Sequence, residues 1–166
     1  MSIIGQELQV VVFGLGEERF ALPVTDVREI LDHRPAFRMP DAPAWLLGLT
    51  DVRGTSVPMI DLRVRLGLGA AETTLATRVL VVETPVADAA PLVLGLVVDR
   101  VLDVSRFGAD AVEPSPDLGG RWRSGHVEAI LRREDGFVAL LDLTRIFAND
   151  DADLFGGDVA PGTLAA

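Results

Sequence analysis

The sequence predicts a mainly β protein made of two tandem five-stranded β-barrel lobes, each followed by a short helix. Most apolar residues fall in short runs of valine, leucine and isoleucine bounded by turn residues, which is typical of strands. The order of these runs repeats in the two halves of the chain. A five-stranded unit that curls on itself removes its exposed edges. We therefore expect a first lobe over residues 8–68, a linker over 69–76 and a second lobe over 77–148.

The first half begins with a predicted hairpin, LQVVVFGL and RFALPV, joined by a turn at GEE. The run DVREILDHR alternates, which predicts a strand with Val27, Glu29 and Leu31 on one face. A proline-rich loop follows, because each proline disfavours helix in the residue before it. The run DLRVRLG predicts a short helix that Asp61 caps and a glycine ends.

An internal repeat relates the two halves. FALPVTDVREIL aligns with LGLVVDRVLDVS, which pairs Val27 with Val101, Ile30 with Val104, and Glu29 with Asp103. GTSVPMIDLRVRL aligns with GFVALLDLTRIF, which pairs Asp61 with Asp142. The same order of strands and short helix is therefore expected in each lobe.

Composition excludes several kinds of catalytic site. The 15 basic residues are all arginines, and the chain contains no cysteine and only two histidines, His33 and His126. Without lysine there is no P-loop, phospho-receiver or Schiff-base site, and without cysteine there is no thiol nucleophile or cysteine-bound zinc. Ser56 lacks the glycine pattern of a nucleophile elbow. We expect no catalytic residues, no metal and no cofactor.

The charge and hydropathy of the chain bear on its partners. A net charge of −10 argues against nucleic acid, since such binding neutralises phosphates with basic side chains. The N-terminus lacks a signal-peptide pattern, and the longest apolar run, PLVLGLVV, is too short to span a bilayer. We expect a cytoplasmic protein without direct membrane insertion.

Several residues are predicted to shape turns and helix ends. Gly54 permits the positive φ of a tight turn, and Pro58 suits a strand edge that needs no N–H partner. Asp61 and Asp142 are expected to cap the two short helices.

Two tryptophans are candidates for partner contacts, because aromatic and arginine side chains are enriched at interfaces. Trp45 has a lobe-packing role as its alternative. Trp122 lies between Arg121 and Arg123 in the segment GGRWRSGH. The acidic, Gly- and Ala-rich residues 150–166 are expected to form a disordered tail after a domain that spans residues 1–149.

Four ordered motifs carry a family resemblance. WLLGLTDVRGTSVPMIDLRVRLGL, GLVVDRVLDV, VVVFGLGEERFALPVTDVREIL and LLDLTRIF together resemble the CheW-like coupling proteins of bacterial chemosensory systems. The likeness runs from about Leu8 to Phe147. The family usually has asparagine where this chain has Asp51, which bears on partner preference and not on the fold.

The resemblance implies a non-enzymatic adaptor with two interlocked five-stranded barrels. Such proteins bridge the cytoplasmic tips of chemoreceptors (methyl-accepting chemotaxis proteins) to the regulatory domain of a CheA-type histidine kinase, and would be recruited to membrane-associated receptor arrays. An adaptor of the same fold that serves type IV pilus motility or biofilm signalling is the alternative.

By matching position, six residues are carried over as receptor-binding: Arg53, Glu29, Val27, Gly95, Val101 and Val104. Each also has a structural interpretation. Arg53 and Glu29 could form an ordinary ion pair, the valines could belong to the core, and Gly95 could serve close backbone approach.

Overall fold

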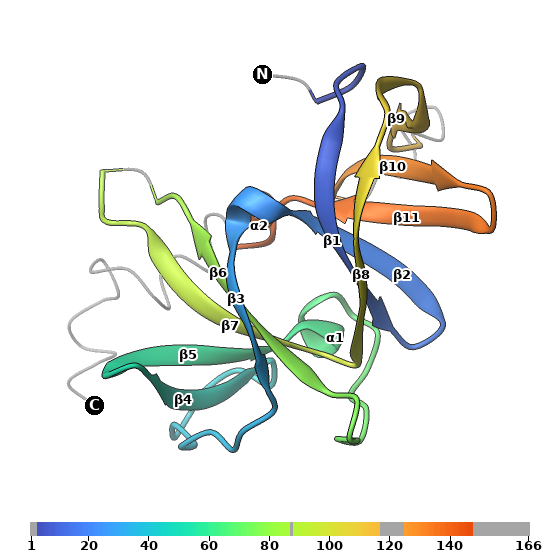
Figure 1. Ribbon diagram of the computed structural model, residues 1–166. Helices are drawn as coiled ribbons and strands as arrows, with labels where there is room; N and C mark the ends of the chain where they lie inside the picture. Colours follow the sequence, from blue (N-terminus) through green and yellow to red (C-terminus); the bar gives the residue numbers. More distant parts are fainter. Residues whose placement is uncertain (1–2, 87, 117–124, 148–166) are drawn as a thin grey trace.

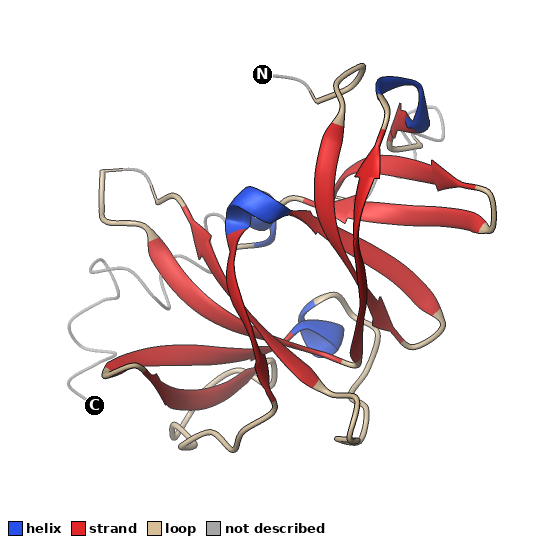
Figure 2. Cartoon of the chain, viewed as in Figure 1, coloured by secondary structure: helices blue, strands red, loops and turns tan. Residues whose placement is uncertain are grey.

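The computed structural model describes residues 3–86, 88–116 and 125–147, in which eleven strands form two curved sheets (Figures 1 and 2). The mainly β fold with two lobes is confirmed. The two α-helices of the described residues, α1 (Leu62–Arg65) and α2 (Leu143–Ile146), have four residues each. Neither is long enough to cross a membrane.

One sheet has six strands instead of the five expected. In spatial order these are β8 (Arg100–Phe107), β1 (Leu8–Leu15), β2 (Glu18–Pro23), β11 (Gly136–Leu141), β10 (Val127–Arg133) and β9 (Val112–Pro114). The 3-10 turn η2 (Ala109–Ala111) connects β8 to β9. The additional strand is the three-residue β9 at the edge of the sheet.

The other sheet has five strands. In spatial order these are β3 (Val27–Asp32), β6 (Arg78–Thr84), β7 (Leu92–Val98), β5 (Thr55–Asp61) and β4 (Leu46–Val52). The 3-10 turn η1 (Val24–Asp26) leads from β2 of the six-stranded sheet into β3 of this one. Residues 69–76, the expected linker, contain no helix or strand.

The two halves of the chain exchange strands. The hairpin β1–β2 belongs to the sheet that otherwise comes from the second half, and β6–β7 completes the sheet that begins in the first half. The ranges 8–68 and 77–148 therefore mark the sequence repeat, while each sheet takes strands from both. The order β8-β1-β2-β11-β10 matches β3-β6-β7-β5-β4 position by position, so the repeat appears as a pseudo-twofold relation.

The β-bulges follow the same relation. The register of β3 on β6 shifts at Arg28, and that of β8 on β1 shifts at Leu102, the residue that the repeat aligns with Arg28. A second matched pair lies at Leu47 in β4 and Glu128 in β10. A bulge adds one unpaired residue and changes which face the next side chains occupy. The faces of β3 and β8 are therefore set by these bulges.

A single apolar core joins the two sheets. Its buried side chains come from both sheets and from both helices, and they are Val11, Phe13, Leu15, Leu22, Ile60, Leu62, Leu80, Val82, Leu94, Leu96, Val98, Leu141, Leu143, Ile146 and Phe147. We call this cluster the shared core. Smaller clusters fill each lobe, around Leu131 in the six-stranded sheet and around Met59 in the five-stranded sheet.

The predicted caps lie where the sequence placed them. Asp61 accepts a hydrogen bond from the Val64 N–H at 3.2 Å, and Asp142 accepts one from Arg145 at 3.3 Å. The expectation that Pro58 lies in an edge strand is corrected, because β5 is an interior strand between β7 and β4. Pairing of β5 with β7 begins only at Met59, so the strand still has a free side at the proline.

Candidate partner-binding surface

The register of β3 and β8 brings four apolar side chains to the border of the shared core. Val27 pairs with Val82 and Ile30 with Leu80, and both partners are buried in the shared core. On the other sheet Val101 pairs with Phe13 and Val104 with Val11, again members of that core. Residues paired across neighbouring strands share a face. The two outer strands thus carry pseudo-equivalent apolar strips, Val27–Ile30 and Val101–Val104.

The inner member of each strip is packed and the outer member is exposed. Val27 and Val101 are half-buried against the shared core. Ile30 and Val104 keep 42% and 55% of their surface accessible. Both β3 and β8 are edge strands that border the middle of the molecule (Figure 1). Exposed branched aliphatic side chains at an open sheet edge suit contact with an apolar partner.

Ile30 is missing from the residues carried over from the family. The signal was present, because the repeat aligns Ile30 with Val104. The expected alternation in this run is also wrong: the bulge at Arg28 places Val27 with Ile30 and moves Glu29 and Leu31 to the opposite face. Glu29 pairs with Val81 and Leu31 with Val79, both in the core of the five-stranded sheet. A period-2 pattern read from sequence fails at a bulge.

Arg53 and Glu29 form a two-bond ion pair on that opposite face. The Arg53 Nε and Nη2 donate to the two Glu29 carboxylate oxygens at 3.2 and 2.9 Å. These bonds hold the pKa of Glu29 below its usual range and raise the pKa of Arg53. The Arg53 side chain is nevertheless 78% exposed. Its guanidinium therefore stays available to a second acceptor.

The backbone of Arg53 is unusual for a residue with a side chain. Arg53 and Gly54 form the two-residue turn between β4 and β5, with φ of 53° and 85°. Gly54 thus has the positive φ predicted from the sequence, and Arg53 has a positive φ as well. Hairpin turns of this kind favour asparagine or glycine at both positions. An arginine held in the left-handed region is the sort of local strain that clusters at functional sites.

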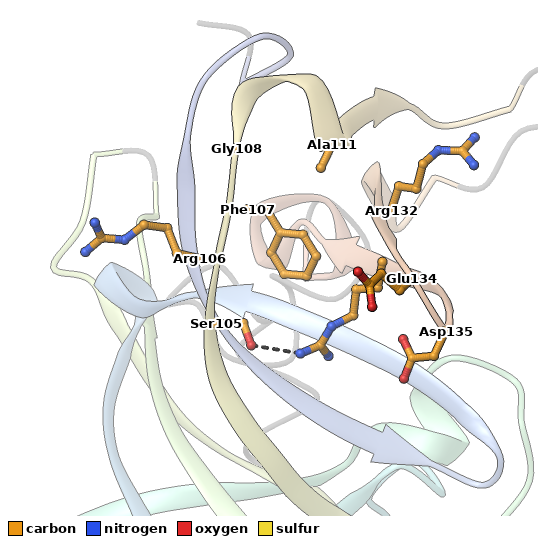
Figure 3. A pocket seen from close by; sticks show the side chains of 9 residues that line it. Ser105, Arg106, Phe107, Gly108, Ala111, Arg132, Glu134 and Asp135 are labelled. Atoms are coloured by element: carbon orange, nitrogen blue, oxygen red, sulfur yellow. Dashed lines mark hydrogen bonds between the residues drawn. The ribbon is translucent and has the colours of Figure 1, made fainter.

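The six-stranded sheet also has an ion pair at the position equivalent to Glu29, but its arginine is half-buried. Asp103, the equivalent of Glu29, accepts two hydrogen bonds of 3.3 Å from the Arg133 guanidinium. Arg133 also donates to the Ser105 hydroxyl at 2.9 Å, which is the dashed line in Figure 3. The Arg133 guanidinium lies 5.5 Å from the Phe107 ring centroid, and its side chain is only 24% exposed. Of these two ion pairs, only Glu29–Arg53 presents its arginine to solvent.

A hollow of about 620 Å³ lies beside the Asp103–Arg133 pair, between the end of β8 and the β10–β11 turn. Its lining is Ser105, Arg106, Phe107, Gly108, Ala111, Arg132, Arg133, Glu134 and Asp135 (Figure 3). The Ser105 hydroxyl donates to Asp103, and no histidine lines the hollow to serve as a base. The geometry does not support nucleophilic chemistry there.

Gly95 does not lie on a partner-binding surface. It is buried in β7, and a Cβ at this position would stand 2.7 Å from the Met59 sulfur. The repeat places Ala21 at the equivalent position, opposite Leu140, as Gly95 is opposite Met59. Gly95 therefore permits close packing inside the five-stranded lobe, and the receptor-contact expectation is corrected for this residue.

Trp45 lies at the junction of the lobes. Its ring packs against the shared core and meets Phe147 edge-on at 6.3 Å, with the Arg65 guanidinium 5.3 Å from the ring centroid. Arg65 also donates to the Ile146 carbonyl at the end of α2. These contacts support the packing role for Trp45. Arg121, Trp122, Arg123 and the tail lie outside the described residues.

Carboxylates at the junction of the lobes give a pH-dependent prediction. Partial burial and the nearby Asp142 raise the pKa of Asp26 above 3.8. A raised carboxyl pKa means that the ionised form destabilises the fold at neutral pH, and that this cost disappears as the pH falls below the unfolded value. Asp26→Asn should therefore raise the melting temperature at pH 7 by about 1–3 °C. The gain should vanish near pH 3.5, and an unchanged or lower value at pH 7 would contradict the assignment.

Comparison with known proteins identifies the family to which this chain belongs. Residues 9–151 match the CheW-like domain family. The chain belongs to the CheW-like family. It is 32% identical over 149 residues to the chemotaxis protein CheW of Rhizobium meliloti (strain 1021), covering 90% of this chain and 92% of that protein.

Two further comparisons extend this result. The crystal structure of the scaffolding protein TtCheW from Thermoanaerobacter tengcongensis matches with a TM-score of 0.76 and 27% identity, over 88% of this chain and 96% of that one. Protein PilI of Pseudomonas aeruginosa is 33% identical over 99 residues, 59% of this chain and 52% of that protein. The CheW-like chain is thus an adaptor of chemotaxis signal transduction, in a family of non-enzymatic scaffolds.

Proposed function

We propose that this CheW-like chain couples chemoreceptors to a CheA-type histidine kinase, and that the receptor tip binds the apolar strips of β3 and β8. The observation that carries the proposal is the paired exposure of Ile30 and Val104 at the border of the shared core. A receptor tip is a helical hairpin, and an amphipathic helix binds through a row of apolar anchors. Arg53 adds a charged contact at the rim, on the other face of β3.

The kinase regulatory domain would meet a different part of the chain, as the family resemblance implies. An adaptor that binds both partners brings the kinase to receptor-bearing membranes without inserting into them. The affinity of each contact can be modest, since an array of many receptors and adaptors gains from multivalency.

Co-sedimentation tests this function. The kinase is mixed with receptor-bearing membranes, with and without the chain, and kinase activity is measured in the pellet. We expect the chain to bring kinase into the pellet and raise its activity. Kinase that pellets equally well without the chain would refute the coupling role.

A variant connects this function to the proposed surface. Val104→Ala should lower receptor affinity about three- to tenfold, because an apolar anchor is truncated. Phe137→Ala removes an equally exposed apolar side chain and serves as the control, since Phe137 packs against Arg132 and lies on β11, which β1 and β2 separate from β8 in the sheet. Equal effects of the two substitutions would mean that the surface is misplaced.

A further inference from the structure

The two apolar strips continue into side chains of opposite charge. Asp32 follows Ile30 on the same face of β3, and Arg106 follows Val104 on the same face of β8. The repeat makes Asp32 and Arg106 equivalent positions, so the apolar centre of the surface is pseudo-symmetric and its ends are not. We call the six residues Val27, Ile30, Asp32, Val101, Val104 and Arg106 the β3–β8 surface.

Both charges are available to a partner. Asp32 is 93% exposed, and Arg78 is 3.7 Å away from it, which makes a long and weak pair. Arg106 is exposed and has no carboxylate within ion-pair distance among the described residues. Its side chain extends from β8 on the side opposite Phe107 (Figure 3). Neither charge therefore makes a strong ion pair within the described part of the chain.

The charges lie at opposite ends of the surface. Asp32 is the last residue of β3, and Arg106 is next to last in β8. The two strands run in opposite directions in Figure 1, so their C-terminal ends lie at opposite ends of the strips. The surface is thus negative at one end, apolar in the middle and positive at the other end.

From this arrangement we infer that Asp32 and Arg106 set the direction in which the receptor helix lies on the β3–β8 surface. A pseudo-twofold surface with only apolar contacts would accept a helix in both directions. Opposite charges at its ends favour the direction that brings an acidic side chain of the helix to Arg106 and a basic one to Asp32. The inference rests on the proposed receptor binding and adds the polarity of the partner to it.

The experiment measures direction and affinity separately. The chain contains no cysteine, so Ala109→Cys gives a single spin-label site three residues beyond Arg106. The probe is a helical-hairpin fragment of a chemoreceptor tip from the same genome, labelled at one end or the other of one arm. We expect one distance population for each labelled end in the original chain. In the double variant Asp32→Arg/Arg106→Glu, the short and long distances should change places while affinity stays within about threefold.

A single variant keeps the inference testable if the double variant does not fold. Arg106→Glu should weaken binding about fivefold at low ionic strength, and by much less at 0.5 M salt, where exposed charges are screened. An unchanged direction in the double variant, or a salt-independent effect of Arg106→Glu, overturns the inference and leaves receptor binding intact. If the original chain does not bind the fragment at all, the proposed function fails, and the inference fails with it.

Discussion

Substitution of Arg53 by glutamate is expected to abolish receptor binding while the fold persists. The guanidinium is exposed at a hairpin turn and shares only part of its donors with Glu29. Arginines at the rim of an interface can be hot spots, and reversing the charge adds repulsion, so affinity should fall about 30-fold or more. The melting temperature should stay within about 3 °C, because an exposed ion pair contributes little stability. Isothermal titration with a receptor-tip fragment and a thermal melt measure the two quantities.

The matched control is Arg132→Glu. Arg132 is also an exposed arginine on a hairpin, and its Nε contacts Glu113 at 2.6 Å. Arg132 lies on β10 of the six-stranded sheet, whereas Arg53 lies at a turn of the five-stranded sheet, so the control tests the same change of charge on the other lobe. Receptor affinity should be unchanged in this variant. A large loss of stability in Arg53→Glu would assign Arg53 a structural role, and retained binding would remove it from the contact surface.

Much of this fold follows from sequence because the repeat is explicit. The aligned pairs Val27/Val101 and Ile30/Val104 occupy equivalent register positions, and Asp61 and Asp142 cap equivalent helices. What periodicity could not supply is which hairpin joins which sheet, since a strand carries no local mark of its neighbours. Only the family resemblance, which implies interlocked barrels, indicates that the hairpins β1–β2 and β6–β7 are exchanged between the sheets.

The site was harder to predict than the fold. Bulges at Arg28 and Leu102 decide which side chains of β3 and β8 lie on the proposed surface, and no residue type in either run indicates a bulge. Gly95 matched a family position, but its backbone is enclosed by Met59 and Val79. Arg53 was named for its side chain, and its positive φ was not foreseen because arginine rarely adopts it. Position in a motif therefore pointed to the strands of the proposed surface and to only some of its exposed side chains.

Because the two sheets share one core, substitution of Leu96 by alanine is expected to cause a large loss of stability. Leu96 in β7 is fully buried in the shared core, where it pairs with Leu80 and Ile60. Leu96→Ala should cost about 2–5 kcal/mol, the range for a leucine deleted from a packed core. That is a large part of the stability of a domain this size. Denaturant unfolding followed by circular dichroism measures the loss.

The same variant distinguishes one cooperative unit from two lobes. Side chains from both sheets and both helices pack together in the shared core, and each half of the chain supplies strands to each sheet. Neither sheet can therefore unfold without disrupting the other, and hydrogen exchange should speed up in β1 and β6 alike. Leu75→Ala, at a fully exposed turn residue, should change nothing. Two separate transitions, or faster exchange in the five-stranded sheet alone, would show that the lobes fold independently and that their angle, and with it the spacing of β3 and β8, is free to vary.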